Sequence, residues 1–309
     1  MNAIYFDSSV NDDTRRRQLY EGQLFVYSPC PSATALCEFA RNMARDAFAP
    51  LDPRTAQYHL TVEKYAAILA ELKPAFIHHP TSKTLIQGIL REVGCDLTKT
   101  YFDVPRMRTA THGDYLTSGI AYAFHPHRDT WYSAPFCQIN WWFPIYDIES
   151  ENSMAFHLRY WNQPVRNGSR DYNYDEWNRV SRKTAAQHIT SDTRKQPRPE
   201  EPVELDPQIR VVAKVGGLLL FSGAHLHSTV PNTSGYTRFS IDFRTVHVDD
   251  VRAGAGAANV DSACTGTTMR DYLRGDDLAH IPDELIALYD TPAPSAEVAA
   301  LGAHGASTA

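Results

Sequence analysis

The chain has 309 residues, a net charge of −6 and 43% hydrophobic residues, as expected of a globular protein with a sizeable core. The mild acidity gives no support to binding of nucleic acid or of an anionic membrane, and no apolar run approaches the roughly 18 residues of a membrane helix. The five cysteines lack CxxC spacing, and the N-terminus lacks the basic and apolar regions of a signal peptide. We therefore expect a cytoplasmic protein with reduced thiols.

The first third of the chain has the apolar spacing of amphipathic helices. Three segments fit this pattern and carry cap residues: residues 33–47, a helix from Thr61 that ends at Lys73-Pro74, and a helix capped by Thr81 or Ser82 that stops at Gly94. We expect residues 1–99 to form a mostly helical scaffold.

From about Thr100 the composition changes to aromatic and β-branched residues separated by turn signals. The expected strands are residues 101–109, 116–124, 136–146, 209–215, 218–221 and 238–246. The last two are joined by turn residues at 231–235, which predicts a strand–turn–strand unit. The sequence thus predicts a mainly β protein with flanking helices, a sandwich or barrel of antiparallel strands.

The last of these strands has two chemically different faces, because side chains alternate along a strand. The apolar face carries Phe239, Ile241, Phe243 and Thr245, and the polar face carries Arg238, Ser240, Asp242 and Arg244. A polar face of this kind does not suit a core, so we expect it to form the wall of a polar pocket.

Residues 159–202 form a polar insert, whose length is typical of a lid or binding loop. It mixes cationic and aromatic residues: Arg159, Arg166, Arg170, Arg179, Arg182 and Lys183 among Tyr160, Trp161, Tyr172, Tyr174 and Trp177. This mixture suits an anionic or sugar-like ligand, and the alternative is a lid whose charges face water. Residues 248–290 are expected to form a helical extension, and residues 291–309 have the composition of a disordered tail.

Two imidazoles and one carboxylate can hold one face of an octahedral Fe(II), and this chain offers such a set. A His-x-Asp triplet would supply two ligands, and it occurs at residues 112–114, 127–129 and 247–249. The first lies at a glycine turn and the third leads into a Gly/Ala-rich loop. Because the second lies between two predicted strands, we expect His127 and Asp129 to be ligands. His225 and His227 could each supply the second imidazole.

His227 is followed by Thr229, Asn232 and Arg238, and residues 238–240 have the form Arg-x-Ser. This spacing resembles the distal-histidine segment of the Fe(II)/2-oxoglutarate-dependent oxygenases, in particular the phytanoyl-CoA dioxygenase (PhyH)-like family. The resemblance selects His227 over His225.

The resemblance covers roughly residues 100–247. It implies a double-stranded β-helix, the jelly-roll barrel of cupin-like enzymes, within one oxygenase domain of residues 1–290. Gly217 stands where the family usually has Asp, and Asn152-Ser153 replaces Asn-Gly. Neither departure removes a ligand.

On this resemblance, His127, Asp129 and His227 would bind Fe(II), which 2-oxoglutarate and O₂ would also contact. Halogenating members of the superfamily replace the carboxylate ligand with a small residue. The presence of Asp129 therefore indicates oxygen chemistry: hydroxylation, or a desaturation or ring closure that begins in the same way.

Five further residues are expected to bind 2-oxoglutarate. Arg238 would hold its far carboxylate through planar donors, and the alternative is a structural ion pair with Asp242. Supplementary hydroxyl donors and pocket-lining amides would come from Ser240, Thr229, Gln138 and Asn140. His125 and Arg128, which flank the ligands, could contact substrate.

The sequence therefore predicts an oxygenase, most simply a hydroxylase, that tailors a small metabolite such as a natural product, sugar or amino acid. No nucleic-acid or membrane partner is expected, and the oligomeric state is open. Two alternatives are a cupin-like isomerase or direct dioxygenase, which would leave Arg238 unexplained, and a metal-free β-sandwich binding module, which would bind no iron.

Overall fold

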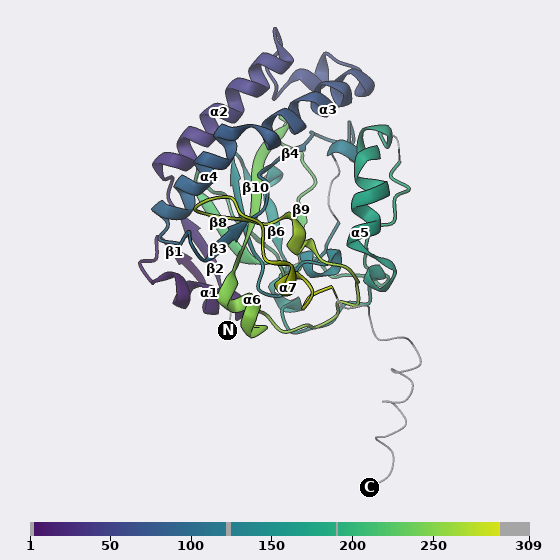
Figure 1. Ribbon diagram of the computed structural model, residues 1–309. Helices are drawn as coiled ribbons and strands as arrows, with labels where there is room; N and C mark the ends of the chain where they lie inside the picture. The colour runs from purple at the N-terminus through teal and green to yellow at the C-terminus, as the bar shows by residue number, and fades with distance from the viewer. Residues whose placement is uncertain (1–2, 122–124, 190, 291–309) are drawn as a thin grey trace.

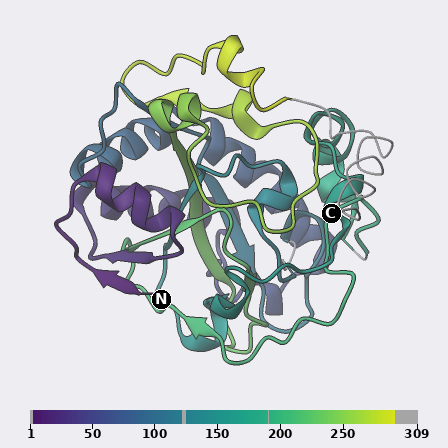
Figure 2. The ribbon, with the colours of Figure 1, turned by 90° about the horizontal axis from the view of Figure 1, so that it is seen from below.

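The computed structural model describes residues 3–121, 125–189 and 191–290, so the predicted tail at 291–309 lies outside the described residues. The protein combines two β-sheets with several helices (Figure 1). In Figures 1 and 2 the N-terminal strands and the helix α5 of the insert lie on opposite sides of the molecule. None of the helices in the described ranges is long and apolar enough to span a membrane.

Two sheets form the centre of the fold. The larger has the order β1-β2-β8-β5-β10-β3-β11, with β4 also paired to β10, and the smaller has the order β7-β6-β9. Neither order closes on itself within the described part of the chain. The strands are β1 Ile4–Phe6, β2 Leu24–Tyr27, β3 Thr100–Phe102, β4 Arg106–Ala110, β5 Ile139–Pro144, β6 Met154–Phe156, β7 Ile209–Arg210, β8 Leu218–Ser222, β9 His227–Thr229, β10 Arg238–His247 and β11 Leu273–Arg274.

Helices from the first third of the chain cover one face of the larger sheet (Figure 1). The α-helices are α1 Asp12–Tyr20, α2 Pro31–Phe48, α3 Val62–His78, α4 Pro80–Glu92, α5 Tyr174–Glu176, α6 Val248–Ala253 and α7 Asp283–Ile286. The three helices predicted in this third correspond to α2, α3 and α4. Their buried side chains and those of β5, β8 and β10 form one apolar cluster.

Two predicted helix boundaries are wrong. Thr61 caps α3 as expected, but the helix continues through Pro74 to His78. The lost hydrogen bond costs about 3 kcal/mol, and burial of Phe76 in the last turn offsets much of that cost. His79, not Thr81 or Ser82, caps α4 by accepting from the Thr81 N–H.

The scaffold of residues 1–99 also contributes strands that the sequence did not reveal. β1 pairs in parallel with β2, and β2 pairs with β8. These strands have three and four residues, too few for a convincing alternating pattern.

The expected strand–turn–strand unit is arranged differently. Its two strands exist as β8 and β10, but both pair with β5 and neither pairs with the other. Between them the chain crosses to the smaller sheet as β9, which pairs with β6. The two strands cannot form a hairpin because β5 occupies the position between them.

The predicted strand at 116–124 is wrong where the chain is described. Gly119 has φ of +60° within the short helix Gly119–Ala121. Residues 122–124 lie outside the described residues. The predicted strand at 209–215 shortens to β7, and that at 101–109 divides into β3 and β4.

The two-faced character of β10 is confirmed. Phe239, Ile241 and Phe243 are fully buried in the cluster beneath the helices. Arg238, Asp242 and Arg244 line a cavity on the other side of the sheet. One strand thus separates the apolar core from the polar site.

Phe239→Ala should lower the free energy of unfolding by about 3–5 kcal/mol, because it leaves a cavity between β10 and the helices. Phe6→Ala, at a side chain 70% exposed on the edge strand, should change it by less than about 0.5 kcal/mol. Urea unfolding of both variants tests this, and equal losses would contradict the assigned core.

Candidate active site

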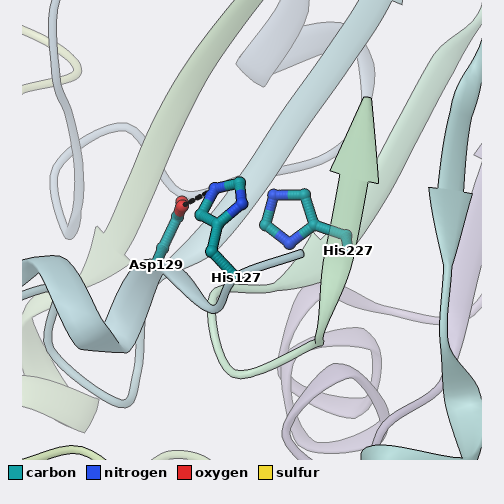
Figure 3. A group of neighbouring side chains, drawn as sticks. All are labelled: His127, Asp129 and His227. Atoms are coloured by element: carbon teal, nitrogen blue, oxygen red, sulfur yellow. Dashed lines mark ion pairs between the residues drawn. The ribbon is translucent and has the colours of Figure 1, made fainter. Parts of the chain in front are cut away.

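His127, Asp129 and His227 lie close together (Figure 3), and all three line the cavity. One ligand atom from each lies within 4.8 Å of the others, and all three residues are buried. His127 Nε2 is 3.6 Å from Asp129 Oδ1, and the two imidazole centroids are 4.3 Å apart. Within the described ranges this is the one cluster of three or more His, Cys, Asp or Glu side chains with such geometry.

Backbone hydrogen bonds bring the ligands together from segments 100 residues apart. The His127 N–H donates to the His227 carbonyl and the His227 N–H donates to the His127 carbonyl, each at 3.0 Å. The bridge fixes the segment before Asp129 to β9. Asp129 then begins the short helix Asp129–Tyr132.

Both histidines present the same ring nitrogen to the site. His127 Nδ1 contacts the His125 carbonyl at 2.7 Å, and His227 Nδ1 contacts the His225 carbonyl at 3.0 Å. These carbonyls accept from the Nδ1–H groups and leave both Nε2 lone pairs for a ligand. Burial, with repulsion from His127, lowers the pKa of His227 to about 3, so its ring is neutral and ready to bind metal.

Asp129 is held as a carboxylate by its neighbours. Gln138 and Asn140 donate their amide N–H groups to Oδ2 at 3.0 and 2.8 Å, and Arg244 Nε lies 3.6 Å from the same oxygen. Burial alone would raise the pKa of Asp129, but the charge of Arg244 holds it well below the usual range. The donor set is therefore two imidazole Nε2 atoms and one carboxylate, which fits Fe(II).

The orientation of Gln138 depends on a residue that the sequence did not single out. Tyr272, beside β11, donates its hydroxyl to Gln138 Oε1 at 2.7 Å. This bond directs the Gln138 amide N–H group toward Asp129. Gln138 and Asn140 thus orient the carboxylate ligand in addition to lining the cavity.

Arg128 lies between the two ligands in sequence but does not line the cavity. Its guanidinium donates to the carbonyls of Ala224, Tyr160 and Gln163 and to the carboxylate of Asp261. Asp261 also accepts from the Trp131 indole and the Val165 N–H. Arg128 therefore braces the ligand segment against the β8–β9 turn, the insert and the C-terminal extension.

Arg238 enters the same cavity from β10 and has no carboxylate within ion-pair distance among the described residues. Its Nη1 donates to the carbonyls of Asn152 and Ser153, while its buried Nε has no partner. Burial lowers its pKa to about 10. The alternative ion pair with Asp242 is not formed, because Asp242 binds Arg108 at 2.5 Å. An unpaired buried guanidinium fits a carboxylate ligand.

The remaining predicted residues differ in whether they line the cavity. Thr229 lines the cavity, whereas Ser240 is fully buried with an unpartnered hydroxyl and is not among the lining residues. His225 is buried with its ring centroid 4.5 Å from that of Trp161. His125 is exposed.

The other two His-x-Asp triplets have structural contacts. His112 Nδ1 accepts from the Gly235 N–H. His247 accepts from the Asp249 N–H as the cap of α6, and Asp249 pairs with Lys99 at 2.9 Å.

The insert supplies aromatic side chains to the cavity, and two of its arginines bind glutamates that do not line the cavity. Tyr172, Tyr174 and Trp177 line the cavity. Arg159 pairs with Glu204 and Arg170 pairs with Glu200, both outside it. The cavity has a volume of about 350 Å³, enough for a small molecule beside 2-oxoglutarate.

No protein-family model and no curated protein matches the sequence. Solved structures similar to it include EvdO2 from Micromonospora carbonacea var. aurantiaca complexed with 2-oxoglutarate, with 10% identity, coverage of 77% of this chain and 92% of that one, and a TM-score of 0.42. SnoN, an α-ketoglutarate-dependent epimerase of nogalamycin biosynthesis, has 12% identity, coverage of 76% and 84%, and a TM-score of 0.36. The non-haem monooxygenase ThoJ has 13% identity, coverage of 69% and 70%, and a TM-score of 0.36.

ThoJ and SnoN are non-haem enzymes, SnoN depends on α-ketoglutarate, and EvdO2 is complexed with 2-oxoglutarate. The PhyH-like branch stays a prediction. The functional inference for this chain comes from its own side chains.

Tyr272→Phe should weaken Fe(II) binding about tenfold or more, because outer partners of metal ligands typically contribute 10–100-fold in affinity. Anaerobic titration with Fe(II) measures this. Tyr289→Phe is a matched control, since its hydroxyl donates to the Val251 carbonyl in the same extension. Unchanged affinity in Tyr272→Phe would show that Gln138 is oriented without it.

Proposed function

We propose that the protein is a non-haem Fe(II)- and 2-oxoglutarate-dependent oxygenase of a small metabolite, most simply a hydroxylase. One observation carries the proposal: the cavity holds a buried His-Asp-His cluster and a buried arginine without a carboxylate partner. The first part suits iron and the second suits the far carboxylate of 2-oxoglutarate.

The chain's own residues would prepare the reaction by position and charge. His127, Asp129 and His227 would hold Fe(II), while Gln138, Asn140 and Arg244 keep the carboxylate ionised and oriented. Arg238 would fix 2-oxoglutarate, with Thr229, and with Ser240 after a small rearrangement, as hydroxyl donors. When bound, iron, 2-oxoglutarate and O₂ supply oxidation of a substrate C–H bond coupled to formation of succinate and CO₂.

The same proposal covers the fold and the biological setting. The two sheets would be the halves of a double-stranded β-helix, in one oxygenase domain of residues 1–290 with a jelly-roll core at 100–247. Apolar contact between them through Trp142, Phe156 and Phe221 supports this arrangement. We place the enzyme in the cytoplasm and in secondary metabolism, without a nucleic-acid or membrane partner.

A metalloenzyme that does not use 2-oxoglutarate is the second candidate. It would share the His-Asp-His cluster but would give the unpaired Arg238 no ligand. A metal-free binding module would explain neither the shared Nε2 orientation nor the ionised Asp129.

Anaerobic addition of Fe(II) and then 2-oxoglutarate should produce the weak visible charge-transfer band of a chelated 2-oxo acid. Alanine at His127, Asp129 or His227 should abolish the band, and the histidine variants should lose iron binding as well. His112→Ala is the control, because His112 is not a cavity-lining residue and its ring accepts from the Gly235 N–H. Iron binding without the band would favour the direct-acting metalloenzyme, and no iron binding would favour the binding module.

Arg238→Ala should keep iron and raise the apparent Kd for 2-oxoglutarate roughly ten- to a hundredfold, because a charged hydrogen bond contributes about 1.5–3 kcal/mol. The charge-transfer band titrated with 2-oxoglutarate measures this Kd. Arg210→Ala is a matched control, since Arg210 donates to the nearby Ser150 carbonyl from an exposed position. Equal affinity in wild type and Arg238→Ala would make the arginine structural.

A further inference from the structure

The described residues that line the cavity carry more positive than negative charge. Six are cationic and two are carboxylates, Asp129 and Asp242. The cations are Lys73, Arg106, Arg108, Arg194, Arg238 and Arg244. Since net charge in a partly buried site is costly, each of these charges needs a partner in the working enzyme.

Ion pairs account for only some of them. Arg108 binds Asp242, and Arg194 binds Asp192, which is not a lining residue. Arg106 and Arg244 share the single buried carboxylate of Asp103. Arg244 also lies 3.6 Å from Asp129, but bound iron would neutralise the charge of that carboxylate.

Iron and 2-oxoglutarate do not remove the excess. Their charges of 2+ and 2− cancel, so the loaded cavity keeps the same positive balance as the empty protein. The far carboxylate of 2-oxoglutarate would neutralise Arg238, and Asp129 with the near carboxylate would neutralise iron. The remaining positive charge lies at Lys73 and at the Arg106–Arg244 pair, on the part of the wall left to substrate.

Lys73 is the cation with the fewest partners. It projects from α3 into the cavity, and its Nζ donates to the Ile120 carbonyl. No carboxylate of the described chain lies within ion-pair distance, although an ammonium group has three donors. Burial, with repulsion from Arg108, lowers its pKa to about 7, against the attraction of Asp242. An anion beside Lys73 would raise this pKa again and stabilise the charged form.

Aromatic side chains of the same cavity complement this charge. The Tyr132 and Tyr172 rings are 5.4 Å apart, and those of Tyr172 and Trp177 are 6.0 Å apart. They provide flat apolar surface for the body of a ligand.

We propose that the substrate carries an anionic oxygen group, a carboxylate or a phosphate, which Lys73 binds while its apolar body lies against Tyr172 and Trp177. This inference rests on the proposed function, because it assigns the part of the cavity that iron and 2-oxoglutarate leave free.

Three small probes of similar shape test the proposal: benzoate, phenyl phosphate and the neutral benzamide. Each is titrated calorimetrically, at constant ionic strength and without O₂, into protein loaded with Fe(II) and saturating 2-oxoglutarate. At least one anion should bind at least tenfold more tightly than benzamide. The anion that binds better identifies the group as carboxylate or phosphate.

Lys73→Met should weaken binding of that anion about tenfold or more, and Lys73→Arg should retain most of it. Lys64→Met, at an exposed position on the same helix, should leave it unchanged. If Lys73→Met does not fold, the test is the affinity of the two anions relative to that of benzamide, measured in wild type and in Lys73→Arg. A preference for an anion in both proteins supports the proposal, and equal affinities overturn it.

The inference is overturned if neither anion binds, if benzamide binds equally well, or if Lys73→Met binds the anion like wild type. Loss of the charge-transfer band during the titration would also overturn it, because the anion would then be displacing 2-oxoglutarate from Arg238. Absence of that band in wild type before any probe is added would instead refute the proposed function.

Discussion

The reciprocal pair of backbone hydrogen bonds between His127 and His227 is the constraint on which the site depends. Neither residue lies in a long strand: one is in a loop and the other begins the three-residue β9. Two bonds of about 1 kcal/mol each would not hold such segments alone. Arg128 adds four hydrogen bonds that tie the same segment to three other parts of the chain. The proposed metal ligands are thus held in place by hydrogen bonds in addition to those of the two sheets.

β10 determines which side chains face the cavity. It pairs with β5 along one edge and with β4 and β3 along the other, so its register is set on both sides. Because that register is fixed, Arg238 and Arg244 must face the cavity while Phe239 and Phe243 face the helices. A shift of the β10 register by one residue would turn its phenylalanines toward the cavity and its arginines toward the helices.

The sequence predicted what depends on local pattern. Alternation in β10, the spacing from His227 to Arg238 and the apolar faces of α2 and α4 are all properties of neighbouring residues. Residues that act across long separations could not be found in this way. Tyr272 reaches Gln138 from 134 residues away, and Asp261 reaches Arg128 from 133 residues away. The strand expected at 116–124 failed because an apolar run does not reveal a left-handed glycine at 119, and the expected stop at Pro74 failed because tertiary burial of Phe76 outweighed local preference.

Because of Asp261 and Tyr272, the functional unit must include residues that follow β10. All three proposed metal ligands and the arginine proposed to bind 2-oxoglutarate precede residue 240, so a shortened chain could retain every one of these groups. Yet the carboxylate that holds Arg128 and the hydroxyl that orients Gln138 come from the following 40 residues. The C-terminal extension is therefore an integral part of the proposed metal centre. A fusion or domain exchange that divides the chain after β10 would separate the proposed ligands from the groups that orient them.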